Sequence, residues 1–356
     1  MLADLGAEVL RVETPDAADP IRNLPGGPAA YDRGKRSVAL NLKHERAPEI
    51  VRRLIARVDV VVDSGLPGPL RDAGVGYDAL AREQPALVWC SITGFGRSSP
   101  YAARAGHDIT FLGYSGLLSL MAGTTVPPTP DFVLTAPFAG LVAAVGILAA
   151  IAERDRTGRG RFVDTSLVDS AMWIIGEAVA RVEAGGSPGW GESASRRAYR
   201  TSDGKLVTLA AAEPRTWAAF CAGIDRPDLQ PLGYSYPGGQ LALAAELEKI
   251  FATRSAAEWL ERLGDTAAAV GPVLTVEELL SDPHVVARGS VIELPGDGDT
   301  RVRALRTPVR YVADDGTPFG FEPGPPPRLG EHTDEELVAA GYSADDIATL
   351  HRESAI

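Results

Sequence analysis

Short apolar runs alternate with a helical pattern over the first part of the chain. Residues 8–13, 58–62 and 86–90 are rich in β-branched and other apolar side chains, and residues 45–57 have the pattern of a helix. Such alternation predicts βαβ units that build a parallel sheet. We therefore expect an α/β protein whose large domain, residues 1–183, is Rossmann-like.

The loops that follow the predicted strands are the first candidates for function. In an open parallel sheet, ligands bind outside the carboxyl ends of the strands. This rule places the loops after Val12, Val62 and Cys90 on one functional rim.

Composition changes after the large domain. Residues 184–198 are rich in Gly, Ser and Pro, which is typical of a linker. A hairpin with an Asp203-Gly204 turn and several helical patterns follow, so residues 199–295 are predicted to form a smaller α+β domain. Residues 296–356 begin with a stretch rich in Pro and Gly and end in a polar helix, and we expect them to form a separate C-terminal segment.

One segment is long and apolar enough to raise the question of a membrane. Residues 132–151 carry no charge, and a segment of this length could span a bilayer. The segment contains Pro137, is dominated by Ala and Gly, and lacks basic or aromatic flanks. It is therefore predicted to be a helix in the core or at a subunit interface.

Overall composition limits the classes of ligand. A chain of 356 residues with 45% hydrophobic residues can build two domains with a buried core, and a net charge of −12 disfavours nucleic acids and anionic membranes as partners. A polyanionic ligand would need a local basic pocket. Cys90 and Cys221 form no pairing framework, which indicates a reducing, cytoplasmic location. The five histidines are scattered without metal-ligand spacing, so we expect no metal site.

His107 is the most informative single residue. It follows the Gly-rich turn at residues 94–96 and is flanked by Gly106 and Asp108. An imidazole titrates in the range needed to take a proton from carbon when a neighbouring group orients it. The alternative is a histidine held by local hydrogen bonds, and spacing alone does not separate the two.

Six blocks of sequence resemble the family III CoA-transferase and α-methylacyl-CoA racemase superfamily, also called the CaiB/BaiF type. They occur in family order along nearly the whole chain, at residues 1–9, 34–43, 91–96, 106–108, 163–170 and 329–335. The resemblance implies an acyl-CoA substrate, with coenzyme A as part of that substrate and no tightly bound cofactor. It further implies an interlocked homodimer, in which the C-terminal segment of each chain returns to the large domain.

The chain departs from this family where the family carries a catalytic aspartate. In the transferases that residue is a covalent nucleophile, and in the racemases it is a second proton carrier opposite the histidine. Here the family position falls on Thr135, Ala136 or Pro137, none of which is acidic. The nearest acid is Asp131, which the resemblance does not make equivalent, and we expect its side chain to point away from His107.

Two carboxylates are candidates to support the histidine. Glu213 matches the position where racemase-like relatives hold a glutamate that hydrogen-bonds the catalytic imidazole, which would fix its tautomer and raise its pKa. Glu213 also precedes Pro214 as the start of a helix would, and the two roles are compatible. Asp108 either orients a neighbour or caps the following helix. We expect His107 and Glu213 to meet, within one chain or between two.

Basic residues near the N-terminus are candidates for the phosphates of CoA. Relatives place CoA-contacting basic residues at Arg22 and Lys43. The wider set of candidates comprises Arg11, Arg22, Arg33, Lys35, Arg36, Lys43 and Arg71. Each of them is alternatively part of a solvated face.

The nucleotide pocket is expected to differ from that of relatives. Residues 64–65 are Ser-Gly where relatives have Asn-Phe, and Asp72 stands at a usually basic position beside Arg71. Relatives also place a strand and most of a helix before Met1, so we expect Met1 to be an internal methionine and part of the nucleotide-binding edge to be missing.

Three functions remain open from the sequence. The first is proton transfer at the α-carbon of an acyl-CoA, racemase- or isomerase-like, with His107 as base and Glu213 behind it. The second is a CoA transferase, with a relocated nucleophile such as Asp131 or as the aspartate-lacking subunit of a heteromer with an aspartate-bearing paralogue. The third is an inactive protein that binds CoA thioesters.

Overall fold

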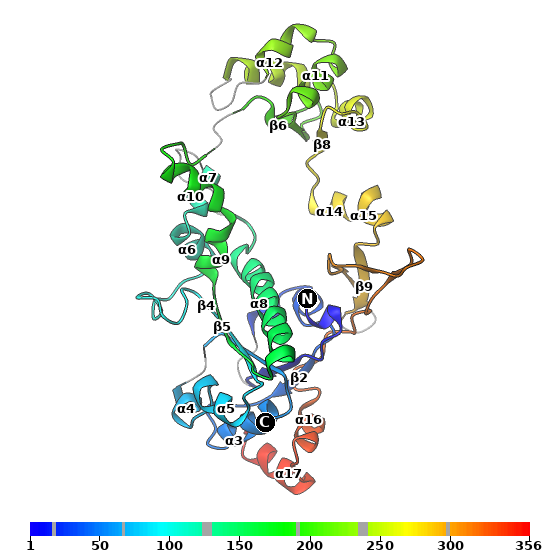
Figure 1. Ribbon diagram of the computed structural model, residues 1–356. Helices are drawn as coiled ribbons and strands as arrows, with labels where there is room; N and C mark the ends of the chain where they lie inside the picture. Colours follow the sequence, from blue (N-terminus) through cyan, green and yellow to red (C-terminus); the bar gives the residue numbers. More distant parts are fainter. Residues whose placement is uncertain (16–18, 66–67, 123–129, 190–192, 234–240, 297–299) are drawn as a thin grey trace. The chain divides into compact units, whose positions relative to one another are not determined.

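The computed structural model describes residues 1–356 except 16–18, 66–67, 123–129, 190–192, 234–240 and 297–299. The chain divides into two compact units (Figure 1). The first comprises Met1–Ile175 together with His284–Ile356, and the second comprises Gly176–Pro283. The C-terminal segment thus belongs to the same unit as the N-terminal part of the chain.

Parallel sheets organise the first unit. Strands β3 (Val60–Asp63), β4 (Val88–Thr93) and β5 (Phe162–Ser166) form one parallel sheet in the order β3-β4-β5. Strands β1 (Leu10–Glu13) and β2 (Arg36–Ala39) form a second parallel pair. The predicted α/β class with parallel strands is confirmed.

Helix α3 shows why the apolar pattern of this unit produces helices. It spans Ala47–Ile55, and Ala47, Ile50, Leu54 and Ile55 are its buried residues, which is the spacing of one helical face. That face packs in a core with Leu80 and Trp89. The other helices that follow β3 are α4 (Gly68–Asp72) and α5 (Tyr77–Glu83).

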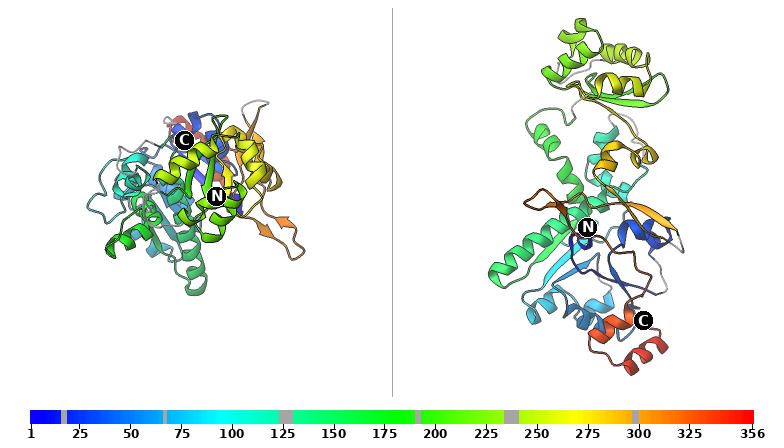
Figure 2. Two further views of the ribbon diagram at one scale, coloured as in Figure 1. Left: turned by 90° about the horizontal axis from the view of Figure 1, so that it is seen from above. Right: turned by 90° about the vertical axis from the view of Figure 1, so that its right-hand side faces the viewer.

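The charge-free segment forms most of α8 (Thr135–Thr157). This helix packs on β4, β5 and α9 (Leu167–Ile174). These elements are labelled in Figure 1, and Figure 2 shows the same ribbon from two further sides. Small side chains allow the close approach, since a Cβ on Gly146 would lie 2.8 Å from Val163 Cγ1. The helix is long and apolar enough to cross a membrane by length and composition, which for a single helix is weak support for a span. Part of its apolar surface, including Leu141 and Val145, is exposed in one chain.

The C-terminal segment is joined to β2 by a motif that extends the edge of the strand. The backbone amide of His332 donates to the carbonyl of Ser37 at 2.9 Å, and the amide of Ser37 donates to His332 Nδ1 at 3.2 Å. The amide of Ala39 donates to Thr333 Oγ1 at 2.9 Å. Side-chain acceptors therefore replace backbone carbonyls along β2.

Helices α16 (Thr333–Ala339) and α17 (Ala344–Arg352) continue from this motif, and α16 packs against β2 and α3. Leu337 and Leu350 are fully buried in the core that contains α3. The remaining elements of the first unit are η1 (Ala3–Leu5), α1 (Pro20–Asn23), α2 (Gly27–Tyr31), α6 (Asp108–Tyr114), α7 (Leu117–Ala122), α15 (Pro283–Ala287), β9 (Val291–Pro295), β10 (Arg301–Leu305), β11 (Tyr311–Val312) and β12 (Pro318–Phe319).

The second unit is built around an antiparallel sheet in the order β6-β7-β8, with strands Arg196–Arg200, Leu206–Ala210 and Val270–Pro272. The Asp203-Gly204 turn lies between β6 and β7, where Gly204 has a φ of +80°. The core of this unit contains the large aromatic residues Tyr199, Trp217, Phe220, Phe251 and Trp259. Its helices are α10 (Gly176–Glu183), α11 (Pro214–Gly223), η2 (Pro227–Leu232), α12 (Leu241–Phe251), α13 (Ala256–Leu263) and α14 (Val276–Leu279).

Candidate active site

Two glycines and one aromatic ring set the path of the backbone to His107. A Cβ on Gly94 would lie 2.7 Å from Phe111 Cε1, and a Cβ on Gly106 would lie 2.8 Å from the same atom. Glycine at both positions thus lets the loop after β4 and the start of α6 close on the ring. His107 is the residue before the first turn of α6, and its backbone amide donates to Thr110 Oγ1 at 3.4 Å.

An aromatic cluster that the sequence analysis did not single out braces the same loop. Phe95 makes edge-on contacts with Tyr101, Phe111 and Tyr114, with ring centroids 5.0–5.8 Å apart. Arg104 lies over the Tyr101 ring, 3.8 Å from its centroid, and donates to the Tyr114 hydroxyl at 2.7 Å. The only sign of this cluster in the sequence is the closeness of four aromatic residues, Phe95, Tyr101, Phe111 and Tyr114. Which of their rings meet depends on how the loop folds back on α6.

His107 lines a pocket of about 370 Å³. The other lining residues are Asp108, Ile109, Leu112, Pro130, Asp131, Phe132 and Val133. The walls are mainly apolar, and among these residues only His107, Asp108 and Asp131 can exchange a proton. Asp131 is among the lining residues, and the expectation that its side chain points away from His107 stays a prediction.

Asp108 is occupied by hydrogen bonds to the start of α8. Its Oδ1 accepts from the Thr135 amide at 2.7 Å and from Thr135 Oγ1 at 2.5 Å, while its Oδ2 accepts from the Leu134 amide at 3.1 Å. The predicted capping role is therefore present, but on α8 and not on α6, the helix that Asp108 begins. Thr135, one of the positions that could match the family aspartate, is buried in this contact.

Asp131 differs from Asp108 in its surroundings. It is exposed, and its side chain makes no hydrogen bond or ion pair to any described residue. The pocket therefore holds one carboxylate that binds a helix start and one that makes no hydrogen bond or ion pair with a described residue.

A second pocket, of about 500 Å³, lies at the carboxyl ends of β3 and β4. The loops after Val62 and Cys90, predicted to share a functional rim, both contribute to it. Its polar and aromatic lining consists of Asp63, Arg71, Tyr77, Asp78, Trp89, Ser91, Thr93 and Arg97, and several glycines leave backbone accessible. Of the predicted CoA contacts, Arg71 lines this pocket.

The charged groups of this second pocket differ in whether they already have partners within the protein. Asp63 accepts hydrogen bonds from Ser91 Oγ at 3.1 Å, from the Gly65 amide at 2.7 Å and from Trp89 Nε1. Arg71 and Arg97 make no ion pair with any described residue, although Arg97 lies 4.6 Å from the centroid of the Phe162 ring. The two cations can therefore bind an anionic ligand, while Asp63 is held by donors from β4 and from the turn that follows β3.

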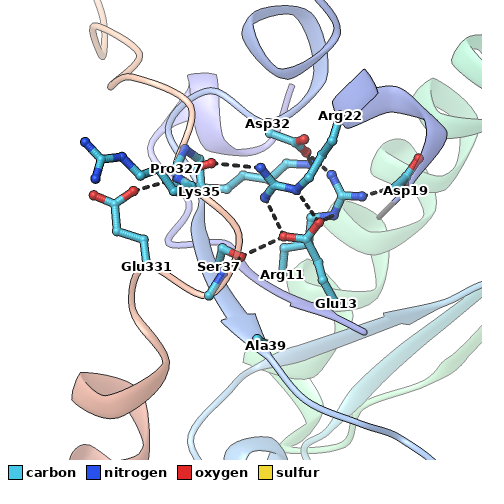
Figure 3. Close-up of polar contacts among 12 residues, drawn as sticks. Arg11, Glu13, Asp19, Arg22, Asp32, Lys35, Ser37, Ala39, Pro327 and Glu331 are labelled. Carbon is cyan, nitrogen blue, oxygen red and sulfur yellow. Dashed lines mark hydrogen bonds and ion pairs between the residues drawn. The ribbon is translucent and has the colours of Figure 1, made fainter. Parts of the chain in front are cut away.

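Arg11 and Arg22 lie in a cluster of ion pairs (Figure 3). Arg11 pairs with Asp19 and Asp32, and Arg22 binds Glu13 through two hydrogen bonds of 2.7 and 2.5 Å and donates to the Pro327 carbonyl at 3.0 Å. These carboxylates already neutralise both guanidinium groups. A role for Arg11 and Arg22 in binding CoA stays a prediction, as it does for Lys43, which is exposed and makes no ion pair with a described residue.

Glu13 is the centre of that cluster. It is 8% exposed, and besides Arg22 it accepts a hydrogen bond from Ser37 Oγ at 2.7 Å, whose oxygen in turn accepts from the Gly330 amide at 2.9 Å. Burial works to raise the pKa of Glu13, but the hydrogen bonds from Arg22 and Ser37 and the charge of Arg11 outweigh it and hold the pKa below its usual value. Glu13 thereby links β1, β2 and the C-terminal segment.

Glu213 lies in the second unit, directly before α11. Its backbone amide donates to Thr216 Oγ1 at 3.1 Å, and Pro214 is the first residue of the helix. The role at a helix start is confirmed. Contact with His107, which would join the two units, stays a prediction.

The comparison with known proteins now decides the family. A model described as CoA-transferase family III matches residues 1–333. The chain belongs to this family. Among relatives of this family III chain is the α-methylacyl-CoA racemase of Homo sapiens, 31% identical, with 100% of the chain and 92% of that protein covered. The succinyl-CoA–L-malate CoA-transferase beta subunit of Chloroflexus aurantiacus is 30% identical, with 95% of the chain and 88% of that protein covered.

A solved structure agrees with this assignment. The CaiB/BaiF family protein from Brucella suis superimposes with a TM-score of 0.79 at 28% identity, covering 95% of the chain and 93% of that structure. Racemase and transferase relatives are thus similar to this family III chain to about the same degree. Family membership is established by these matches, whereas the reaction depends on the groups in the pocket.

The contact between Asp108 and α8 can be tested by stability. Asp108→Ala should lower the free energy of unfolding by about 1–3 kcal/mol, because the first amides of α8 lose their acceptor. Urea unfolding followed by circular dichroism measures the change. Asp131→Ala is the matched control from the same pocket and should change the value by less than about 0.5 kcal/mol. Equal losses in the two variants would contradict the assignment.

The pH dependence of stability follows from Glu13. Because its folded-state pKa lies below the usual value of 4.5, its contribution is fully present above pH 4.5 and is lost as pH falls through the lower folded-state pKa. Glu13→Gln should therefore destabilise the protein at neutral pH and flatten the loss of stability in acid. Thermal unfolding from pH 7 to pH 3 measures this, with the exposed Glu8→Gln as control; an unchanged acid slope in Glu13→Gln would refute it.

Proposed function

We propose that this family III protein acts on an acyl-CoA thioester by proton transfer at the α-carbon, with His107 as the base. The observation that carries the proposal is the position of His107 in a pocket with mainly apolar walls. Apolar walls suit the hydrocarbon part of an acyl group, and an imidazole titrates near the pH at which such a base must work.

The pocket at the ends of β3 and β4 is suited to the nucleotide part of coenzyme A. Arg71 and Arg97 supply positive charge for phosphate groups, which a chain with a net charge of −12 must provide locally. Coenzyme A is then part of the substrate, and the proposed chemistry needs no tightly bound cofactor. Among the described residues no group of histidine, cysteine and carboxylate side chains is placed to hold a metal ion.

The proposed step begins when the His107 imidazole removes the α-proton. The electron pair of the C–H bond moves into the thioester carbonyl and gives an enolate, which hydrogen-bond donors must stabilise. Glu213 would support this step by accepting a hydrogen bond from the imidazole, either in the same chain or across a homodimer. Such a contact fixes the tautomer and favours the protonated ring once the proton has arrived.

Exchange of the α-hydrogen with solvent tests this function. Purified protein incubated with a 2-methylacyl-CoA in deuterated water should incorporate label at the α-carbon, as followed by mass spectrometry. His107→Ala should reduce the rate by about two to four powers of ten, the usual contribution of a positioned general base. Exchange at the wild-type rate in His107→Ala would overturn the proposal.

A CoA transferase is the second candidate, and the free carboxylate of Asp131 in the same pocket favours it. In that reaction the carboxylate attacks the thioester carbonyl, a mixed anhydride forms and CoA leaves as the thiolate. Hydroxylamine would trap the acyl group on the protein. Because one relative is named as a beta subunit, pairing with an aspartate-bearing paralogue is a variant of the same candidate.

We propose further that the protein is a cytoplasmic homodimer. Leu141, Val145 and Leu148 form an exposed apolar stripe on α8, and Trp173 on α9 is 80% exposed. Side chains of this kind at helical spacing on the surface of one chain are typical of an interface. Cys90 and Cys221 are both buried free thiols, which suits a reducing compartment.

The proposed dimer can be tested by placing a charged side chain in the proposed interface. Val145 is 68% exposed in one chain, so Val145→Asp should leave the fold intact and convert a dimer into monomers. Light scattering coupled to size-exclusion chromatography measures the mass. Arg156→Gln, near the charged end of the same helix, should remain dimeric, and a wild-type protein that is monomeric at micromolar concentration would refute the proposal.

A further inference from the structure

We propose that His332 is a pH-sensitive latch, which holds the C-terminal segment to β2 while its imidazole is neutral and loosens that attachment when the imidazole is protonated. The observation behind this proposal is the direction of one hydrogen bond. The backbone amide of Ser37 donates to His332 Nδ1 at 3.2 Å. An amide N–H can only donate, so Nδ1 offers its lone pair and the neutral ring carries its proton on Nε2.

The latch lies at the edge of β2 that faces away from β1. The strand pairs in parallel with β1 on one side. On the other side the Ser37 amide donates to His332 Nδ1, and the Ser37 carbonyl accepts from the His332 amide at 2.9 Å. Two residues further along, the Ala39 amide donates to Thr333 Oγ1 at 2.9 Å. Ser37 is fully buried, so water cannot take the place of His332 while this edge stays closed.

Protonation of His332 places two donors against each other. A protonated imidazole carries an N–H on both ring nitrogens and has no acceptor to offer. The Ser37 amide then has no partner at this edge, and a buried amide without a partner costs free energy. The closed latch therefore binds fewer protons than the open one. Opening becomes easier as pH falls from 8 to 5, the range in which an imidazole changes its charge.

The latch is connected to β1 through the side chain of Ser37. Its hydroxyl accepts from the Gly330 amide at 2.9 Å and donates to Glu13 at 2.7 Å (Figure 3). Arg22, which binds Glu13, also donates to the Pro327 carbonyl at 3.0 Å. Opening of the latch is thereby coupled to the ion-pair cluster at the carboxyl end of β1.

The other charged groups around the latch do not produce the same effect between pH 8 and pH 5. Among the described residues, those on β1, on β2 and the residue before it, on residues 327–332, on α16 and on their direct ion-pair partners are Arg11, Glu13, Asp19, Arg22, Asp32, Lys35, Arg36, Arg57, Arg328, Glu331, Asp334, Glu335, Glu336 and His351. Carboxylates and arginine or lysine side chains ordinarily keep their charge in this range. Glu13 contributes fully above pH 4.5, so its loss in acid occupies a separate range.

His351 is the remaining histidine of this set, and its titration acts in the opposite direction. Its Nε2 lies 2.8 Å from Asp334 Oδ1. Protonation of His351 strengthens the attraction to that carboxylate and therefore favours the attachment of α17 to α16. A loss of attachment on acidification is thus the signature of His332.

Hydrogen exchange of the full-length protein at pH 8 and pH 5 tests the latch. Peptides that cover residues 36–40 are followed by mass spectrometry, and the rates are corrected for the chemical effect of pH on amide exchange. In the wild type their protection should fall about tenfold at pH 5, the value of one hydrogen bond. His332→Asn places an amide oxygen near the position of Nδ1 without a titrating ring, so protection should be equal at both pH values. His332→Ala should already have the low protection at pH 8.

Two further histidines provide matched controls. His44 Nδ1 also accepts from a backbone amide, that of Arg46 at 3.2 Å, but this bond stays within one loop. His44→Asn and His351→Gln should both keep the dependence on pH that the wild type shows. Peptides from β7 in the second unit should keep their protection at pH 5, because the opening is local to β2.

Three results would overturn the latch. The first is a wild-type protein whose residues 36–40 are equally protected at pH 8 and pH 5. The second is His332→Asn that still loses protection at pH 5. The third is His351→Gln or His44→Asn that abolishes the dependence on pH, since the titrating group would then be another histidine.

Discussion

The three hydrogen bonds that Asp108 accepts at the start of α8 are the contact on which the pocket depends. They join the loop that carries His107 to the segment that carries Asp131, across 26 and 27 residues of chain. An uncapped helix start leaves several backbone amides without partners, so α8 itself favours this closure. Two neighbours thereby differ in what they contact: His107 lines the pocket, and Asp108 holds the start of α8.

A similar division applies to the basic residues. Much of the positive charge near the N-terminus is used inside the fold, where Arg11 and Arg22 neutralise buried or half-buried carboxylates and connect β1 and β2 to the C-terminal segment. Breaking such a cluster leaves a buried charge without a partner, which is costly. Arg71 and Arg97, which make no ion pair with a described residue, lie in the pocket at the ends of the strands.

The family contains relatives named for racemisation and for CoA transfer, and one structural difference can separate these reactions in a shared fold. A carboxylate that can reach the carbonyl carbon acts as a nucleophile, whereas one that reaches the α-hydrogen acts as a proton carrier. In this chain the carboxylate to be tested for either role is that of Asp131, which lines the His107 pocket.

The sequence by itself determined the α/β class, the parallel strands and the second, hairpin-containing unit, because these follow from local periodicity and from short motifs. Tertiary structure decided which charges are available. Arg11 and Arg22 are candidate phosphate contacts in the sequence, and only the folded chain shows that Glu13, Asp19 and Asp32 lie beside them. The Asp108 cap on α8 brings the segment that carries Asp131 to the pocket of His107, which distance along the chain did not indicate. Pairing of charges and closure of a pocket are set by residues far apart in the chain, which a linear pattern does not contain.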